Sequence, residues 1–267
     1  MMQYKKDDFL GIEKDSTLYE REIEVLSFRT LDSTQAEARR HAVRGGHAPT
    51  LILADTQTNG RGRLGRDFWS PPSTGIYMTL LFDLTGDTPF AVSHITSAVA
   101  VAVTRAIESI TGVRCGIKWV NDVYVGGRKA CGILAESFVA NDRRYAAVGV
   151  GVNLSTEEFP EELRSVAVSL LREKKEDTRR ALTVALAASV CDAVDGLRAG
   201  DTSYIDEYRS RSVVLGREIT FVRNGETGEG VAIDIDDDGG LRVLLRDGQR
   251  TTLTGGEITL RVKETQA

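Results

Sequence analysis

The chain has 267 residues and a formal net charge of −5 at pH 7, with three cysteines and three histidines. This acidic balance argues against a protein whose main role is to coat nucleic acid, and the longest apolar runs are too short to span a bilayer. The cysteines are widely spaced and form no C-x-x-C pair, so neither a disulfide framework nor a zinc site is indicated. The first residues are charged and carry no apolar signal core, so we expect a cytoplasmic protein with no membrane partner.

In chain order, strand and helix patterns alternate through the first 210 residues. Thr34 and Glu37 have the spacing of a capping box, which predicts a helix that starts there and ends at Gly45. The elements predict an α+β fold with a mixed sheet and packed helices. Strands are expected at residues 22–30, 50–55, 76–83, 113–140 with breaks at 121–122 and 126–127, and 143–155, and helices at 34–44 and at about 90–110, 178–197 and 202–210.

The residue pattern of the sequence changes after residue 212. The turn strings "RNGETGEG", "DIDDDGG" and "RDGQ" stand between short strands and are spaced about ten residues apart. This pattern predicts a small β-barrel. We therefore divide the chain into an N-terminal extension at residues 1–22, a larger domain at 23–211 and a C-terminal barrel at 212–267.

The stretch "TNGRGRLGRDFWSPP" at residues 58–72 contains G-x-G-x-x-G, a string typical of dinucleotide-binding sites. Such a site requires a helix that opens directly on the glycines. Two prolines and a strand follow here instead, which disfavours a nicotinamide-dependent oxidoreductase. The glycines are therefore expected in a loop between two strands.

Arg61, Arg63 and Arg66 alternate with those glycines. Arginine presents planar donors that suit carboxylate and phosphate oxygens, and glycine lets the backbone approach a ligand closely. The neighbouring Phe68 and Trp69 offer a face on which a purine could stack. The loop thus predicts an anion site, with a solvated, flexible loop as the alternative.

Two further stretches carry candidate polar groups. The first, "KWVNDVYVGGRK", contains Lys118, Asn121, Asp122 and Lys129. Asn121 and Asp122 interrupt a strand, where they could bind a metal-chelated phosphate or a ribose hydroxyl; an ordinary Asx turn is the alternative. The second, "GVGVNL" at residues 149–154, has alternate glycines that leave one strand face bare. A flat ligand on that face, with Asn153 at its polar end, is one interpretation and tight packing against a helix is the other.

Together these motifs resemble the biotin protein ligase family. The likeness covers most of the chain, and the combination is specific although each motif alone is weak. The matching stretches are "DST" (32–34), "QTNGRGRLGR" (57–66), "KWVND" (118–122), "GRKACGIL" (127–134), "GVGVNL" (149–154) and "GGEITLR" (255–261).

The resemblance implies a ligase that joins biotin to ATP, releases pyrophosphate and passes biotin from biotinyl-AMP to one lysine of a biotin carboxyl carrier protein. It implies a catalytic domain of the biotin/lipoate ligase type at residues 23–211, an SH3-like barrel after it, Mg²⁺ with the nucleotide, and a homodimer. Because few residues precede the first predicted strand, we expect the short form without a DNA-binding domain, and no DNA partner.

The resemblance also implies the site residues. Those for biotin are Ser33, Thr34, Gln57, Gly60, Arg61, Gly62, Arg63, Lys129 and Gly132. Those for ATP are Arg63, Arg66, Phe68, Trp69, Asn121, Lys129 and Asn153. The catalytic residues are Arg63, Lys129, which bridges the carboxylate and the α-phosphate, and Asp122, which stands near Mg²⁺ and the incoming lysine. A cationic loop that closes over two anions offsets their repulsion and keeps water from the mixed anhydride.

The chain departs from the family pattern at two positions. Val120 stands where the family usually has proline, and Phe68 stands where it usually has tryptophan, so either Phe68 or Trp69 could stack on adenine. Two alternative functions stay open: a lipoate or octanoate ligase of the same fold, which would need an apolar tunnel for its acyl chain, and a non-catalytic regulator that binds biotinyl-AMP.

Overall fold

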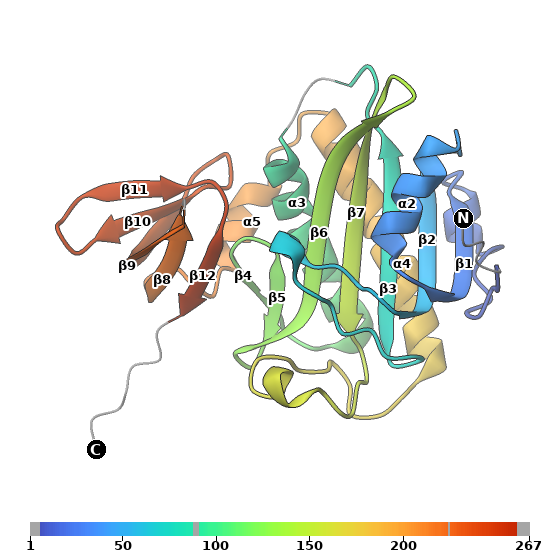
Figure 1. The fold of residues 1–267 in the computed structure, drawn as a ribbon, viewed down its shortest axis with the longest axis horizontal. Helices are drawn as coiled ribbons and strands as arrows, with labels where there is room; N and C mark the ends of the chain where they lie inside the picture. The colour runs from blue at the N-terminus through green and yellow to red at the C-terminus, as the bar shows by residue number, and fades with distance from the viewer. Residues whose placement is uncertain (1–5, 88–90, 224, 261–267) are drawn as a thin grey trace.

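The computed structural model describes residues 6–87, 91–223 and 225–260 (Figure 1). The larger part is a seven-stranded sheet with helices on both faces, and the C-terminal part is a separate five-stranded antiparallel sheet. Within the described ranges, no helix is long and apolar enough to cross a membrane. The predicted α+β architecture is confirmed.

The large sheet has the strand order β1-β2-β3-β7-β6-β5-β4. Strands β1 and β2 are parallel, since helix α2 (Thr34–Val43) connects them as a crossover, and all other neighbours are antiparallel. The strands are β1 (Glu24–Leu31), β2 (Thr50–Gln57), β3 (Gly75–Asp83), β4 (Gly116–Lys118), β5 (Asp122–Val125), β6 (Arg128–Ala140) and β7 (Arg143–Asn153).

Helices cover both faces of the centre of this sheet. Helix α2 packs on one face over β2, β3 and β7, whereas α3 (Val92–Thr111) and α4 (Glu176–Arg198) pack against each other on the opposite face (Figure 1). Strand β3 is therefore buried from both sides, which explains why its sequence is nearly continuously apolar instead of alternating. The short helix α1 (Ser16–Tyr19) of the N-terminal extension packs on α4.

The C-terminal sheet has the order β11-β10-β9-β8-β12. Helix α5 (Tyr204–Ser210) precedes it, so the predicted boundary at residue 211 falls between α5 and β8. Its strands are β8 (Glu218–Arg223), β9 (Glu226–Ile235), β10 (Leu241–Leu245), β11 (Arg250–Leu253) and β12 (Glu257–Leu260).

The predicted capping box at the start of α2 is wrong. Ser33 is the N-cap residue, and its Oγ accepts a hydrogen bond from Ala36 N. Glu37 is then one position too far along the helix to reach back to the cap. It forms ion pairs with Arg40 and Arg44 instead, each at 2.6 Å. The prediction failed because it placed the helix start one residue too late.

Candidate active site

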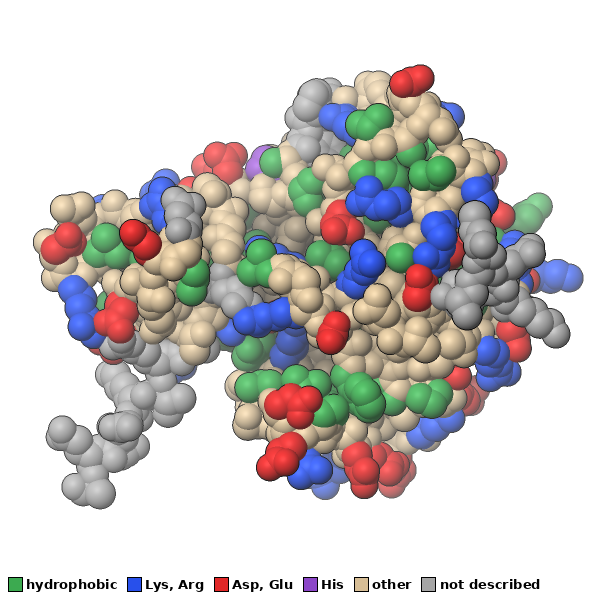
Figure 2. Space-filling model, in the orientation of Figure 1, with side chains coloured by type: hydrophobic (Ala, Val, Ile, Leu, Met, Phe, Trp, Pro, Cys, Tyr) green, Lys and Arg blue, Asp and Glu red, His purple; other side chains and the backbone are tan. Residues whose placement is uncertain are grey.

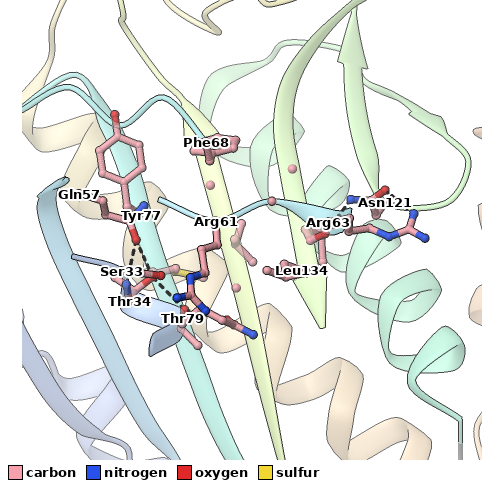
Figure 3. A pocket seen from close by; sticks show the side chains of 18 of the residues that line it. Ser33, Thr34, Gln57, Arg61, Arg63, Phe68, Tyr77, Thr79, Asn121 and Leu134 are labelled. Atoms are coloured by element: carbon pink, nitrogen blue, oxygen red, sulfur yellow. Dashed lines mark hydrogen bonds between the residues drawn. The ribbon is translucent and has the colours of Figure 1, made fainter. Parts of the chain in front are cut away.

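A pocket opens on the α2 face of the sheet, where the loop between β2 and β3 passes over β6 and β7 (Figure 3). It encloses about 460 Å³, part of which is open to solvent. Its wall is formed by the start of α2, the end of β2, the loop and strands β3, β6 and β7, with one residue from the turn between β4 and β5. The fold thus brings together the separate stretches that the sequence singled out.

The neutral end of the pocket, defined by Ser33, Thr34, Gln57 and Thr79, contains a connected hydrogen-bond network. Gln57 Oε1 accepts from Thr34 N at 2.8 Å and from Thr34 Oγ1 at 3.2 Å. Thr79 Oγ1 donates to Thr34 Oγ1 at 2.9 Å, and Gln57 Nε2 donates to Ser70 Oγ at 2.9 Å. These partners fix the side chains without a ligand, so this end is preorganised for a neutral polar group.

The arginine loop (residues 58–72) has a fixed base. Phe68 N donates to Gly60 O at 2.9 Å, and Gly62 N donates to Arg66 O at 2.7 Å. A Cβ at Gly60 would lie 2.5 Å from Phe68 O, so the close approach of the two loop arms requires glycine at that position. The prediction that this glycine string lies in a loop between two strands is confirmed.

The cationic end is defined by Arg63, Asn121 and Lys129, which line the pocket, and by Asp122, which contacts Lys129. Arg63 and Asn121 lie across from the neutral end (Figure 3). Arg63 Nη1 donates to Asn121 Oδ1 at 3.0 Å, and Asn121 Nδ2 donates to Ile133 O at 2.8 Å. Lys129 Nζ lies 2.7 Å from Asp122 Oδ1. Guanidinium and ammonium groups are the side chains that bind carboxylate and phosphate oxygens, and Arg63 and Lys129 bring one of each to this end of the pocket.

The surface next to the pocket is also rich in arginine, although the whole chain is acidic. Figure 2, which views this face, shows basic side chains interspersed with acidic ones. A second hollow beside α2 shares Arg61 with the pocket and is bordered by Arg39, Arg40 and Arg44. Arg40 and Arg44 are each paired with Glu37, and Glu136 also lines this hollow, so the arginines there stand among carboxylates.

The ring of Phe68 covers the bare glycine face of β6 and β7. A Cβ added to Gly151 would lie 2.6 Å from the Phe68 ring, and one added to Gly132 would lie 3.5 Å from it. Lys129 Nζ is 6.0 Å from the ring centroid, and the Tyr77 ring meets it edge-on at 6.3 Å. The flat group over Gly151 is therefore Phe68 of the arginine loop, whereas a Cβ added to Gly149 would lie 2.9 Å from Gln35 Oε1 on α2. Close packing against a helix thus holds at Gly149 and not at Gly151.

Ten of the predicted site residues line the pocket: Ser33, Thr34, Gln57, Arg61, Gly62, Arg63, Phe68, Asn121, Lys129 and Gly132. Five do not: Gly60, Arg66, Trp69, Asp122 and Asn153. Gly60 forms the loop base, Asp122 pairs with Lys129, and Asn153 Nδ2 donates to Lys129 O at 3.4 Å. Arg66 and Trp69 are exposed, so of the two candidate aromatic rings the structure places Phe68 in the pocket.

Nine lining residues were not among the predicted site residues. Five of them lie within stretches that the sequence singled out: Ile133, Leu134, Gly149, Val150 and Gly151. Four lie outside those stretches: Gln35, Tyr77, Met78 and Thr79. Tyr77 and Thr79 are two residues apart on β3 and so point to the same face. Two polar groups on one face of an otherwise apolar strand were the signal that could have found them. Burial raises the pKa of the Tyr77 hydroxyl well above its usual range, so Tyr77 stays neutral and donates to Pro71 O.

Two family models match the chain. The model described as the biotin/lipoate A/B protein ligase family matches residues 27–153, and the model described as the biotin protein ligase C-terminal domain matches residues 214–261. The first range contains every residue that lines the pocket, and the second contains the C-terminal sheet up to the end of the described residues.

Relatives and a solved structure point to the same family as the two family models. The bifunctional ligase/repressor BirA of Bacillus spizizenii is 34% identical over 226 residues, which cover 82% of this chain and 68% of that protein. The biotin--[acetyl-CoA-carboxylase] ligase of Mycobacterium tuberculosis is 30% identical over 227 residues, which cover 83% of this chain and 82% of that protein. A biotin protein ligase from Aquifex aeolicus, solved in complex with biotin and ATP, has a TM-score of 0.74 and 26% identity and covers 89% of this chain and 98% of its own. The chain belongs to the biotin protein ligase family.

Proposed function

We propose that this chain activates biotin with ATP, forms biotinyl-5′-AMP and pyrophosphate, and transfers the biotinyl group to one lysine of a biotin carboxyl carrier protein. The observation that carries the proposal is that a neutral hydrogen-bonding end and a cationic end share one pocket. Biotin has the matching chemistry, with a neutral ureido ring at one end and a carboxylate at the other. The ligases among its relatives support the same assignment.

The neutral end would hold the ureido ring. A ureido group offers one carbonyl acceptor and two N–H donors, and hydroxyl and amide side chains such as those of Ser33, Thr34 and Gln57 complement both kinds of group. A site built from such groups discriminates strongly against a ligand that cannot make the hydrogen bonds, because its own polar atoms would be left unpaired.

The cationic end would serve the first reaction. A carboxylate oxygen of biotin bonds to the α-phosphorus of ATP, the bond from that phosphorus to the β-phosphate oxygen breaks, and pyrophosphate leaves. Arg63 and Lys129 reduce the repulsion between the two anions and stabilise the charge that develops between them. Phe68 is the ring available for contact with adenine.

The second reaction needs a carboxylate near the acyl group. The amine of the carrier lysine bonds to the acyl carbon of biotinyl-AMP, the bond to the phosphate oxygen breaks, and AMP leaves while the amine loses a proton. Asp122, which touches Lys129 just outside the pocket wall, is the carboxylate that we assign to orienting this amine.

Mg²⁺ accompanies the nucleotide in this proposal. Among the described residues, no group of three or more acidic, histidine or cysteine side chains could hold a metal ion. Mg²⁺ in nucleotide sites is commonly bound by one or two carboxylates, with phosphate oxygens and water as its other ligands. Asp122 supplies one such carboxylate beside the cationic end, so the residues fit an ion that arrives bound to ATP.

The test is exchange of labelled pyrophosphate into ATP with biotin, lipoate or octanoate as the acid. We expect exchange with biotin alone, because the hydroxyl and amide groups of the neutral end would be left unpaired by an aliphatic acyl chain. Exchange with lipoate or octanoate but not with biotin would show that the chain is an acyl ligase of the same fold. Exchange with none of the three would favour a non-catalytic regulator.

We further propose that the enzyme acts in the cytoplasm as a homodimer and does not bind DNA. Light scattering at several protein concentrations measures the oligomeric state, and a mobility-shift assay with the DNA upstream of its own gene measures DNA binding. A monomer at all concentrations, or a specific shift that depends on biotin and ATP, would contradict the respective proposal.

A further inference from the structure

The presenting turn (residues 119–121) carries Asn121 to the pocket and leads directly into Asp122, the first residue of β5. Its other two residues point inward: Trp119 is 4% exposed and Val120 is 7% exposed. The turn therefore has a polar side toward the pocket and a buried side away from it. The contacts made by Trp119 and Val120 therefore determine the position of Asn121.

The buried side is held by residues from the last third of the chain. Trp119 Nε1 donates to Gly239 O at 2.9 Å, and Gly239 belongs to the turn between β9 and β10 of the C-terminal sheet. Tyr208 of α5 donates from its hydroxyl to Val120 O at 2.8 Å. Burial raises the pKa of the Tyr208 hydroxyl far above its usual range, so the group stays protonated and can donate.

The β9–β10 turn is itself rigid. Gly239 N donates to Asp236 O at 3.0 Å, and Gly240 N donates to Asp236 Oδ1 at 2.6 Å. Gly239 has a φ of 81°, and a Cβ there would lie 2.9 Å from Ser97 Oγ on α3. The carbonyl that accepts from Trp119 is therefore fixed against the helices of the larger domain.

The polar side of the presenting turn makes two of the contacts that define the cationic end. Asn121 accepts from Arg63 of the arginine loop at 3.0 Å, and Asp122 lies 2.7 Å from Lys129. The first contact is a hydrogen bond and the second an ion pair, and both weaken when their atoms move apart, so a shift of the turn would weaken both contacts together.

We infer that Trp119 and Tyr208 are positioning residues for the cationic end. They fix the backbone of the presenting turn so that Asn121 and Asp122 meet their partners. Among the described residues, those that line the pocket end at Gly151, so the C-terminal sheet takes part in nucleotide use without a side chain in the pocket. This inference rests on the proposed function, since it assigns Asn121 to ATP and Asp122 to the Mg²⁺ that accompanies ATP.

The variants Trp119→Phe and Tyr208→Phe each remove one donor and keep an aromatic ring. We expect kcat/KM for ATP in biotin-dependent pyrophosphate exchange to fall about 5- to 30-fold, because a buried carbonyl loses its partner. The Kd for biotin without ATP should not change, since Thr34, Gln57 and Thr79 are fixed by one another. The matched control is Tyr145→Phe, which removes a hydroxyl from a buried tyrosine at the start of β7, outside the pocket lining.

A double-mutant cycle separates positioning from a general loss of stability. If Trp119 acts through Asn121, then Trp119→Phe should have little further effect on ATP use in an Asn121→Ala background, whereas a general structural effect would add in full. Full additivity, an equal loss of biotin affinity, or an equal effect in Tyr145→Phe would overturn the inference.

The melting temperature of each variant shows whether it folds. If Trp119→Phe does not fold, Tyr208→Phe provides the test. An unchanged kcat/KM for ATP in a folded Tyr208→Phe would then overturn the inference. A parent protein with no biotin-dependent exchange would overturn the proposed function itself. Normal exchange by the parent, together with unchanged ATP kinetics in Trp119→Phe, would overturn the inference alone.

Discussion

The two ends of the pocket are built in different ways. At the neutral end, Thr34, Gln57 and Thr79 come from a helix and two strands and are hydrogen-bonded to one another. At the cationic end, Arg63 comes from the arginine loop, where the next residue, Leu64, is 71% exposed and has a φ of 56°. The neutral end is thus held by hydrogen bonds among neutral groups, whereas the cationic end combines a loop arginine bonded to Asn121 with a lysine paired to Asp122.

Under the proposed function, we expect the biotin end to exist before the nucleotide binds and the arginine loop to complete the site when both anions are present. Substitutions at the two ends should therefore have separate kinetic signatures: loss of biotin affinity at the neutral end, and loss of adenylate formation or retention at the cationic end.

The largest effect is expected for Lys129→Ala. Removal of one preorganised cation between the carboxylate and the α-phosphate should lower the rate of adenylate formation about 10²- to 10³-fold. Circular dichroism should show an intact fold, and the exposed Lys174→Ala serves as the matched control. Near-parental pyrophosphate exchange in Lys129→Ala would show that Lys129 does not contribute to adenylate formation.

The next effect concerns Arg63, which we assign to holding the closed loop over the adenylate. Arg63→Gly should still form biotinyl-AMP but release it, because each lost charge-assisted hydrogen bond costs about 1.5 to 3 kcal/mol. The released mixed anhydride should then biotinylate albumin added to the assay, which the parent leaves unlabelled. No adenylate at all would mean that Arg63 is essential to bond formation; unchanged carrier selectivity would mean that it does not hold the loop.

Gln57→Ala tests the neutral end of the pocket. It leaves two donors on Thr34 and one acceptor on Ser70 without their partner, and we expect an increase of about tenfold in the KM for biotin. The KM for ATP should stay at the parental value. Equal changes in both constants would show that the two ends do not act separately.

The smallest expected effect is a change in the accessibility of the arginine loop to protease. Trypsin should cut the free protein within the arginine loop at Arg61, Arg63 or Arg66, and biotin with ATP should slow the cut. The measurement is mass spectrometry of the fragments over time. A cleavage rate that ignores both ligands would contradict a loop that closes on them.

The sequence predicted much of the fold and of the cationic end, because both depend on local patterns. Apolar periodicity located the strands, and the arginine loop and the "KWVND" stretch carried their chemistry in consecutive residues. Thr79 was missed because its strand is buried from both sides and reads as apolar, so the polar pair Tyr77 and Thr79 on one face of the strand was overlooked.

Other features could not be predicted from local patterns. Trp119 and Gly239 are 120 positions apart, and no spacing rule connects a buried indole to a carbonyl in another sheet. The direction in which a side chain points also depends on residues far away in the sequence. The motif that includes Asn153 was found, but the Asn153 amide donates to Lys129 O and does not line the pocket.

The central claim is that this pocket makes biotinyl-AMP and delivers the biotinyl group to a carrier lysine. Intact-mass spectrometry of a biotin carboxyl carrier domain, incubated with the protein, biotin, ATP and Mg²⁺, tests it most directly. The account predicts a carrier mass increased by one biotinyl group, with no increase when ATP is omitted or the acceptor lysine is replaced. An unchanged mass, for a carrier domain that a known ligase does biotinylate, would contradict it.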